Sequence, residues 1–335
     1  MSINTIGDLA QSYLLRRQNG DLKAQMGTLI EELSSGRTSD VARHLSGSYS
    51  YLADVERNLS LLEGYDSATN EARLFTDTMQ NALEGFQKVA SDLGLDLITA
   101  SQSNMAPIIT AISDRAAGDL DVMLSKLNTN IGGRFLFSGI DTDVAPVTNA
   151  DTMLTALRTE LAGATDLADI QTRLDTWFGP GGGFETVTYQ GSTTSLAPFA
   201  LGRGETVDLD LRADDASTRA LLKHTALAAL AADDVLVFPA DLRQQMIDAA
   251  GKGLSFEQSG VTQIRADLGY AQSRIEESAT RISAERTSFQ TARTELLAVD
   301  PYETVTRLED VQFQLEGLYT ITARLSRLSL TDYLA

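Results

Sequence analysis

The side chains that most often carry out chemistry are few in this sequence. Its only histidines, His44 and His224, lie far apart along the chain, and cysteine is absent. The histidines could form a metal site or a catalytic dyad if the fold joined them, but no H-E-x-x-H or G-x-S-x-G motif accompanies them. The absence of cysteine excludes disulfides, thiolate zinc sites, iron–sulfur clusters and cysteine nucleophiles. Isolated surface or packed histidines are therefore the simpler interpretation.

Paired aspartates could act as acid–base carboxylates or bind calcium, but their spacing favours solvent exposure. No EF-hand spacing accompanies them. Asp208 and Asp210 alternate with leucines, which places both carboxylates on one face of a strand, most simply the solvated face. The pairs are Asp208/Asp210, Asp214/Asp215 and Asp233/Asp234.

Glycine-rich segments and neighbouring aromatic residues could indicate a phosphate or ligand site. Residues 132–133 and 179–183 lack the G-x-x-x-x-G-K-[ST] spacing of a phosphate loop, so turns are the better interpretation. Trp177 and Phe178 are expected to anchor a core, with a ligand platform as the alternative. We therefore predict no catalytic residue, no metal ligand, no cofactor and no enzymatic activity. A soluble acidic enzyme would need a cluster of titratable residues in 138–250, which the sequence does not show.

Composition excludes several kinds of partner. The 335 residues include 27 Lys and Arg and 46 Asp and Glu, a net charge of −19. This charge opposes binding to nucleic acid and to anionic membranes, because both require clustered basic residues. No run of apolar residues is long enough to span a bilayer. The amino-terminal stretch lacks the pattern of a signal peptide, so export would use another route.

The two ends of the chain show the spacing of coiled coils. Four of the six prolines lie between residues 146 and 239, so the flanks are nearly free of helix breakers. Apolar residues follow a 3.5-residue period from Leu15 to Leu33, with Asn19 as a polar position that can fix register. The clearest seam runs from Val261 to Leu296, interrupted only by Ser278 and Glu285. Gly36 is expected to end the first helix and Pro301 to begin the last.

The middle of the chain has a different pattern. Residues 138–250 hold 7 basic and 17 acidic residues, and they predict short helices over 151–178 and 216–232. Residues 184–189 and 206–211 alternate apolar and polar side chains, which predicts half-buried strands. We expect a mainly α fold, a long antiparallel helical bundle or coiled coil from both termini with a small α+β insert. Its parts are an amino-terminal helical arm (1–137), an acidic insert domain (138–250) and a carboxy-terminal helical arm (251–335).

The narrow seams at the ends suggest an assembly role. A lone helix cannot bury such a seam, and a two-helix pair often depends on neighbouring subunits. We therefore predict that the termini dock onto other copies or partners; an ordinary monomeric bundle is the alternative. The predicted interface residues are Leu22, Met26, Leu29, Leu33, Leu308, Val311, Leu315, Leu318 and Leu325.

Three stretches resemble the bacterial flagellin superfamily. Residues 25–37, QMGTLIEELSSGR, resemble the end of the family's first helix, and the carboxy terminus from Asp300 is similar as well. The stretch GGRFLFSG resembles the family's glycine–aromatic signature, with Gly133, Phe135, Phe137 and Gly139 as motif residues. Phe135 and Phe137 are expected to plug the junction of arm and insert, with a docking spot for a partner as the alternative. The family's Asp-Asp pair after the first helix is missing, because residues 40–45 read DVARHL.

Within the superfamily, the hook–filament junction proteins, or third hook-associated proteins, are the most similar. The resemblance implies a non-enzymatic structural subunit in the bacterial flagellum, outside the cell, exported by the flagellar type III route without a cleaved signal. It implies a ring of copies packed through coiled-coil termini. The implied partners are a neighbouring hook-associated protein, flagellin and an export chaperone, with no nucleic acid and no membrane. The alternative within the family is a flagellin, the filament subunit.

Overall fold

The computed structural model describes residues 4–47, 49–103 and 105–334, and within these ranges it describes side chains from residue 10 to 324. The helices are α1 (Asn4–Ser35), α2 (Val41–His44), α3 (Ser50–Ser101), α4 (Ala106–Leu127), α5 (Ala150–Leu161), α6 (Leu167–Phe178), α7 (Ala216–Leu230), α8 (Ala240–Leu297) and α9 (Pro301–Leu334). A π-helical turn η1 (Phe184–Thr188) and two antiparallel hairpins, β1 (Asn130–Ile131) with β2 (Arg134–Phe135) and β3 (Phe199–Gly202) with β4 (Glu205–Val207), complete the described elements. The mainly α prediction is confirmed.

The chain forms two compact units. One contains the described residues up to Glu63 together with those from Ala284 onward, and the other contains Gly64–Ser283. Helices α3 and α8 contribute residues to both units. The predicted insert, 138–250, lies within the second unit, whereas the division into arm, insert and arm stays a prediction.

In the second unit, α3 and α8 run antiparallel and approach each other closely at Gly94 of α3 and Gly251 of α8. Gln87 donates to Thr262 at 2.9 Å, and Gln272 donates to Asp77 at 2.7 Å farther along the pair. A Cβ added at Gly251 would lie 2.9 Å from Ile98 Cγ1 and 3.0 Å from its backbone nitrogen. Small residues at this point therefore allow the helix backbones to approach each other.

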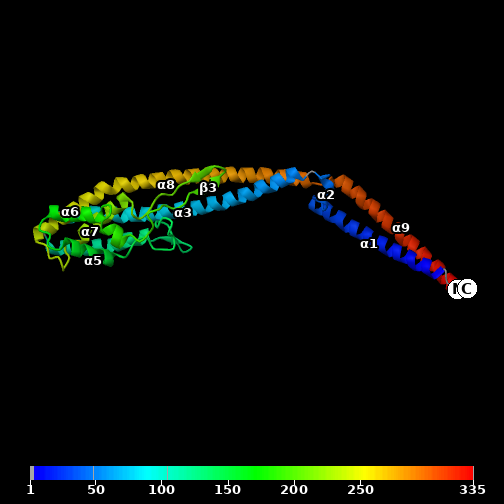
Figure 1. Ribbon diagram of the computed structural model, residues 1–335, viewed down its shortest axis with the longest axis horizontal. Helices are drawn as coiled ribbons and strands as arrows, with labels where there is room; N and C mark the ends of the chain where they lie inside the picture. Colours follow the sequence, from blue (N-terminus) through cyan, green and yellow to red (C-terminus); the bar gives the residue numbers. More distant parts are fainter. Residues whose placement is uncertain (1–3, 48, 104, 335) are drawn as a thin grey trace. The chain divides into compact units, whose positions relative to one another are not determined.

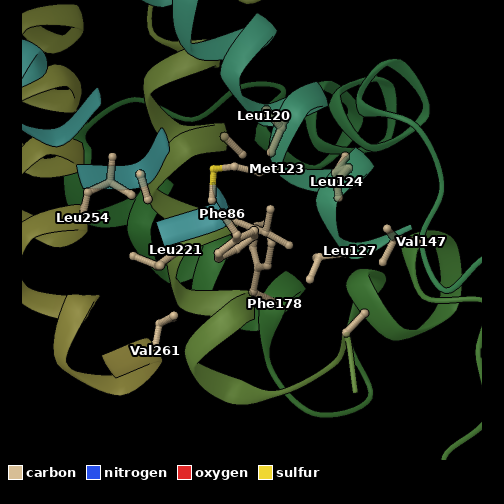
Figure 2. Packing of buried hydrophobic residues seen from close by; sticks show 14 of the residues in the cluster. Phe86, Leu120, Met123, Leu124, Leu127, Val147, Phe178, Leu221, Leu254 and Val261 are labelled. Carbon is tan, nitrogen blue, oxygen red and sulfur yellow. The ribbon is translucent and has the colours of Figure 1, made fainter. Parts of the chain in front are cut away.

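The main core lies where α4 and the insert helices pack onto this pair. Figure 2 shows Phe86 of α3 among Met123 of α4, Leu221 of α7 and Leu254 of α8, with Phe178 of α6 nearby. Phe86 and Met123 are completely buried. Five helices thus contribute to one apolar cluster, which gives the second unit its own buried core.

The β3–β4 hairpin covers the helix pair beyond this core. Phe199 contacts Phe75 of α3 edge-to-face, with ring centroids 5.7 Å apart. On the α8 side, Glu205 pairs with Arg281 and accepts a 3.4 Å hydrogen bond from Ser278. Ser278 is completely buried, so the polar interruption in the seam is a side chain that this hairpin covers.

The strand predicted over 184–189 is wrong, because this segment forms η1. Its buried residues are Phe184 and Thr188, four residues apart, and the Tyr189 amide donates to the Phe184 carbonyl at 2.8 Å. Phe184 packs against Trp177 and Phe178, at ring-centroid distances of 6.3 and 5.7 Å. The short alternating pattern did not reveal this tertiary aromatic contact, which favours a helical turn.

Two further boundaries differ from the prediction. The second predicted strand is ordered as a strand only over β4, and α8 begins at Ala240, well before the seam at Val261. The early part of α8 buries a broad face, including Leu242, Met246 and Leu254, rather than a narrow heptad seam. Heptad spacing alone therefore does not indicate where this helix starts. The predicted ends at Gly36 and Pro301 are confirmed.

The close approach of α3 and α8 generates a stability prediction. Gly251→Ala should lower the free energy of unfolding by about 1–3 kcal/mol, because its methyl group overlaps Ile98. Gly269→Ala, on the same helix with no atom within 4 Å of the added Cβ, should be neutral or raise stability by about 0.5–1 kcal/mol. Chemical denaturation of both variants measures the difference. Equal effects would show that the close approach carries no constraint.

Candidate assembly surface

In the first unit, α1 and α9 form a two-helix pair that joins the two ends of the chain (Figure 1). Lys23 lies 5.9 Å from the ring of Tyr319, and Leu29 lines the same groove as Val311, so the helices run antiparallel. Asn19 and Lys23 hydrogen bond to Tyr319, and these bonds lower the pKa of the Tyr319 hydroxyl. The polar seam position Asn19 thus has a specific partner, as expected of a residue that fixes register.

The predicted interface residues lie along this pair, and the most enclosed of them are covered within one chain. Leu22, Val311 and Leu318 are 6–8 % exposed. Met26, Leu29, Leu308 and Leu315 are half-buried, whereas Leu33 is 38 % exposed. Leu325 lies outside the residues whose side chains are described. The structure therefore brings the two seams together, and their role between copies stays a prediction.

The pair leaves apolar side chains on its outer faces that the seam pattern missed. Tyr302 and Phe313 of α9 are 87 % and 77 % exposed, and Tyr13 and Leu14 of α1 are 66 % and 61 % exposed. These positions fall outside the 3.5-residue seam, so heptad analysis does not select them. Several large exposed apolar side chains on one thin pair indicate an interaction surface.

A polar turn closes the pair at the end of α1. The chain leaves α1 through Gly36, at φ +67°, and pairs with the segment between α8 and α9. The Thr38 amide donates to the Leu297 carbonyl at 2.9 Å, and the Val299 amide donates to the Gly36 carbonyl at 3.1 Å. These bonds tie the amino-terminal and carboxy-terminal connections together.

Glu32 organises this turn from inside. Glu32 is 9 % exposed, and its carboxylate accepts a 2.7 Å hydrogen bond from the Ser39 amide and a 3.5 Å bond from the Thr38 hydroxyl. Asp40 then caps α2 by accepting from the Arg43 amide at 3.0 Å. Glu32 and Asp40 thus provide acceptors in a turn where the Asp-Asp pair is missing. In the segment between α8 and α9, the Asp300 carboxylate accepts a 2.8 Å hydrogen bond from the Tyr302 amide and caps α9.

A groove of about 790 Å³ lies between α1 and α9 beside this turn. Leu29 and Val311 contribute apolar surface, while Arg43, His44 and Arg307 contribute basic groups. His44 is exposed, and it belongs to a different unit from His224. Among the described residues, no group of His, Asp and Glu is arranged to hold a metal ion.

The glycine–aromatic signature lies in the second unit, where it forms a tight turn. Gly133 occupies φ +85° between β1 and β2, and Gly139 occupies φ +66° with a would-be Cβ only 2.3 Å from the Thr194 carbonyl oxygen. Phe137 is 1 % exposed, whereas Phe135 is half-buried. The motif therefore packs against the chain itself, and its glycines allow a backbone path closed to other residues. A partner site at Phe135 stays a prediction.

Arg134, inside the same motif, makes contacts with α3 that sequence analysis did not predict. Its guanidinium carbon lies 4.7 Å from the centre of the Phe75 ring, and it pairs with Glu71 of α3. A cation over an aromatic face and a carboxylate partner both stabilise this position. The signature therefore also attaches the turn to the long helix.

The paired aspartates, the neighbouring aromatic residues and His224 lie in surroundings that account for them as structural residues. Asp208 and Asp210 are exposed on either side of the buried Leu209, as predicted. Trp177 and Phe178 are each 5 % exposed and contact each other edge-to-face, which confirms them as core anchors. Burial of the imidazole lowers the pKa of His224 to about 4, with Lys223 adding to the shift and Asp175 opposing it.

Comparison with known proteins finds a match in the carboxy-terminal part of the chain. Residues 254–334 match the bacterial flagellin C-terminal helical region. This part of the chain is flagellin-like. No curated protein is detectably similar in sequence. Since flagellins are structural proteins, the match indicates a flagellar structural protein and confirms the expectation that it is not an enzyme.

The fold is shared with two solved structures. A protein from Vibrio parahaemolyticus assigned as a flagellar hook-associated protein is 14 % identical, with a TM-score of 0.54 over 73 % of this chain and 95 % of that one. Bacillus cereus FlgL is 15 % identical, with a TM-score of 0.52 over 72 % of this chain and 100 % of that one. Within the described ranges, no helix combines the length and apolar character that a membrane span requires.

The buried carboxylate in the turn gives a matched pair of variants. Glu32→Ala should lower stability of the α1 turn by about 1–3 kcal/mol, because the Ser39 amide loses its acceptor. Glu31→Ala, at the exposed neighbouring position, should have little effect. Hydrogen exchange at the Ser39 amide measures the turn directly. Unchanged protection in Glu32→Ala would contradict this account.

The buried imidazole predicts a pH dependence of stability. In the unfolded chain His224 titrates near 6.5, whereas in the folded chain its pKa is about 4. The unfolded state therefore binds the proton first, and stability falls by up to about 3 kcal/mol as the pH drops from 6.5 to 4. His224→Gln should remove this component, whereas His44→Gln at the exposed site should retain it. Urea unfolding across this pH range tests both; identical profiles for wild type and His224→Gln would refute the assignment.

Proposed function

We propose that this chain is a structural subunit of the bacterial flagellum that forms the junction ring between a hook-associated protein and the flagellin filament. The observation that carries the proposal is the α1/α9 pair, which brings both ends of the chain into one thin element and whose α9 helix lies inside the flagellin-like region. Its apolar outer faces give neighbouring subunits a surface to pack against. The likeness in fold to a hook-associated protein and to FlgL supports the junction position over others in the flagellum.

The proposal implies a set of partners and a location. Copies of the chain contact one another in the ring through coiled-coil packing of the termini, with the seam residues from Leu22 to Leu33 and from Leu308 to Leu325 forming each pair. A neighbouring hook-associated protein and flagellin contact the two sides of the ring. The subunit lies outside the cell after export by the flagellar type III route, and an export chaperone covers its termini beforehand. The segment around Phe135 contributes to the junction of arm and insert.

A flagellin, the subunit of the filament itself, is the second candidate, because the matched region is described as that of flagellin. The two functions differ in how far assembly proceeds. A junction subunit stops at a ring, whereas a flagellin polymerises into long filaments in isolation. Electron microscopy of the purified chain after seeding with filament fragments distinguishes them: long homopolymers would favour flagellin.

The seam residues test the assembly role in cells. Leu315→Asp with Leu318→Asp places two charges against α1, so filaments should detach or fail to form and swimming should be lost. Gln312→Asp with Thr320→Asp adds the same charge at exposed positions of α9 and should preserve swimming. The measurement is the number of filaments per cell in a strain that lacks its own copy of the gene. Normal filaments with the leucine variant would refute the interface assignment.

A further inference from the structure

A groove in the second unit lies between α8 and the segment that follows β4. Its volume is about 300 Å³. Leu209 of the segment and Leu268 of α8 both line it and are 4 % and 6 % exposed, so the groove has an apolar floor. The residues that line it are Asp208, Leu209, Asp210, Leu211, Asp215, Ile264, Asp267, Leu268 and Ala271.

The segment on one wall of this groove is an extended strand without a partner. No turn or bend interrupts residues 208–212, and burial alternates along them, with Leu209 buried and Asp208 and Asp210 exposed. Within the described ranges, the backbone amides and carbonyls of Leu209, Asp210 and Leu211 form no hydrogen bond with the rest of the chain. Unpaired donors and acceptors along an extended segment are a template for an added strand.

The neighbouring strand β3 does not supply these missing bonds. Its pairing with β4 ends at Phe199 and Val207. Pro198, the residue before Phe199, has no amide hydrogen to continue the ladder. The hairpin therefore stops where the groove begins, and the segment continues alone along α8.

The groove also carries carboxylates that this chain leaves uncompensated. Asp208, Asp210 and Asp267 are exposed, and no ion pair among the described residues includes any of them. Arg212 and Arg265, the basic residues nearest to them in sequence on the two walls, pair with other carboxylates. The charge of the groove therefore favours a basic occupant.

We propose that this groove binds an extended basic segment of another protein, which adds a strand to residues 208–211. The backbone of the added strand pairs with the free groups of the segment, and its inward side chains cover the apolar floor. Lys or Arg at alternate positions then faces Asp208 and Asp210 across the strands. A second copy is a poor source of such a segment, because this chain has a net charge of −19.

Synthetic peptides test the groove on the full chain. The probe is Lys-Val-Lys-Val-Lys with blocked ends, and its control is Lys-Lys-Lys-Val-Val, which has the same charge and composition without the alternation. At about 100 mM salt, which screens general attraction to an acidic protein, fluorescence anisotropy should show about fivefold tighter binding of the alternating peptide. Methylation of its internal amide nitrogens should remove this advantage, because the backbone donors are lost. Hydrogen exchange at residues 208–211 should slow only with the unmethylated alternating peptide.

A matched pair of variants assigns the binding to this groove. Asp208→Asn with Asp210→Asn should weaken binding of the alternating peptide about fivefold, because two exposed ion pairs with the peptide are lost. Asp114→Asn with Asp121→Asn, at exposed positions of α4, removes the same charge and should bind the peptide as wild type does. Circular dichroism of both variants verifies that their helices are intact.

Several results would overturn the proposed strand addition. These are equal binding of the alternating, control and methylated peptides, or unchanged binding by the Asp208 and Asp210 variant. Self-association of the wild-type chain that this variant abolishes, measured by sedimentation velocity, would replace the basic partner with a second copy. The groove belongs to the second unit, whereas the proposed function rests on the α1/α9 pair and is tested by filament attachment in cells, so either can fail while the other stands.

Discussion

The antiparallel pairing of narrow apolar seams from opposite ends of the sequence is the constraint on which the first unit depends. Such a seam buries too little area for one helix to be stable alone, so each end of the chain needs the other. The α1/α9 pair meets this need with few buried positions, chiefly Leu22, Val311 and Leu318. The turn at Gly36 and the backbone bonds between the two connections close the pair at one end. Everything proposed about assembly starts from this thin element.

The two units bury their apolar side chains in different ways. The second unit adds α4 and the insert helices to the α3/α8 pair, and Phe86, Met123 and Leu254 are buried in a multi-helix core. The first unit has only pairs of helices to bury its seams, and side chains such as Phe313 and Tyr302 are left on its surface. The second unit also exposes large apolar side chains, such as Phe256, Val235 and Tyr270, so the two units differ in their buried cores and not in exposed apolar surface.

Polar residues at buried or half-buried positions set the alignment of the helices. Asn19 hydrogen bonds to Tyr319 across the α1/α9 pair, and Ser278 meets Glu205 under the β3–β4 hairpin. Glu32 is enclosed in the turn that it organises. Because Ser278 and Glu32 would be costly to bury without their partners, and Asn19 would lose its hydrogen bond, a shift in register would be unfavourable. These contacts give long, repetitive helices a single alignment.

The sequence by itself determined the helical class, the helix ends at Gly36 and Pro301, and the flagellin-like character of the carboxy-terminal region, because heptad spacing, glycine and proline act locally. It also determined that Trp177 and Phe178 are core anchors. Only the tertiary structure decided that residues 184–188 form a helical turn against those rings, that α8 begins at Ala240, and that Arg134 lies over Phe75. It alone decided which surface of α9 is left outside. These features depend on contacts between residues far apart in the chain, and a local pattern carries no information about such contacts.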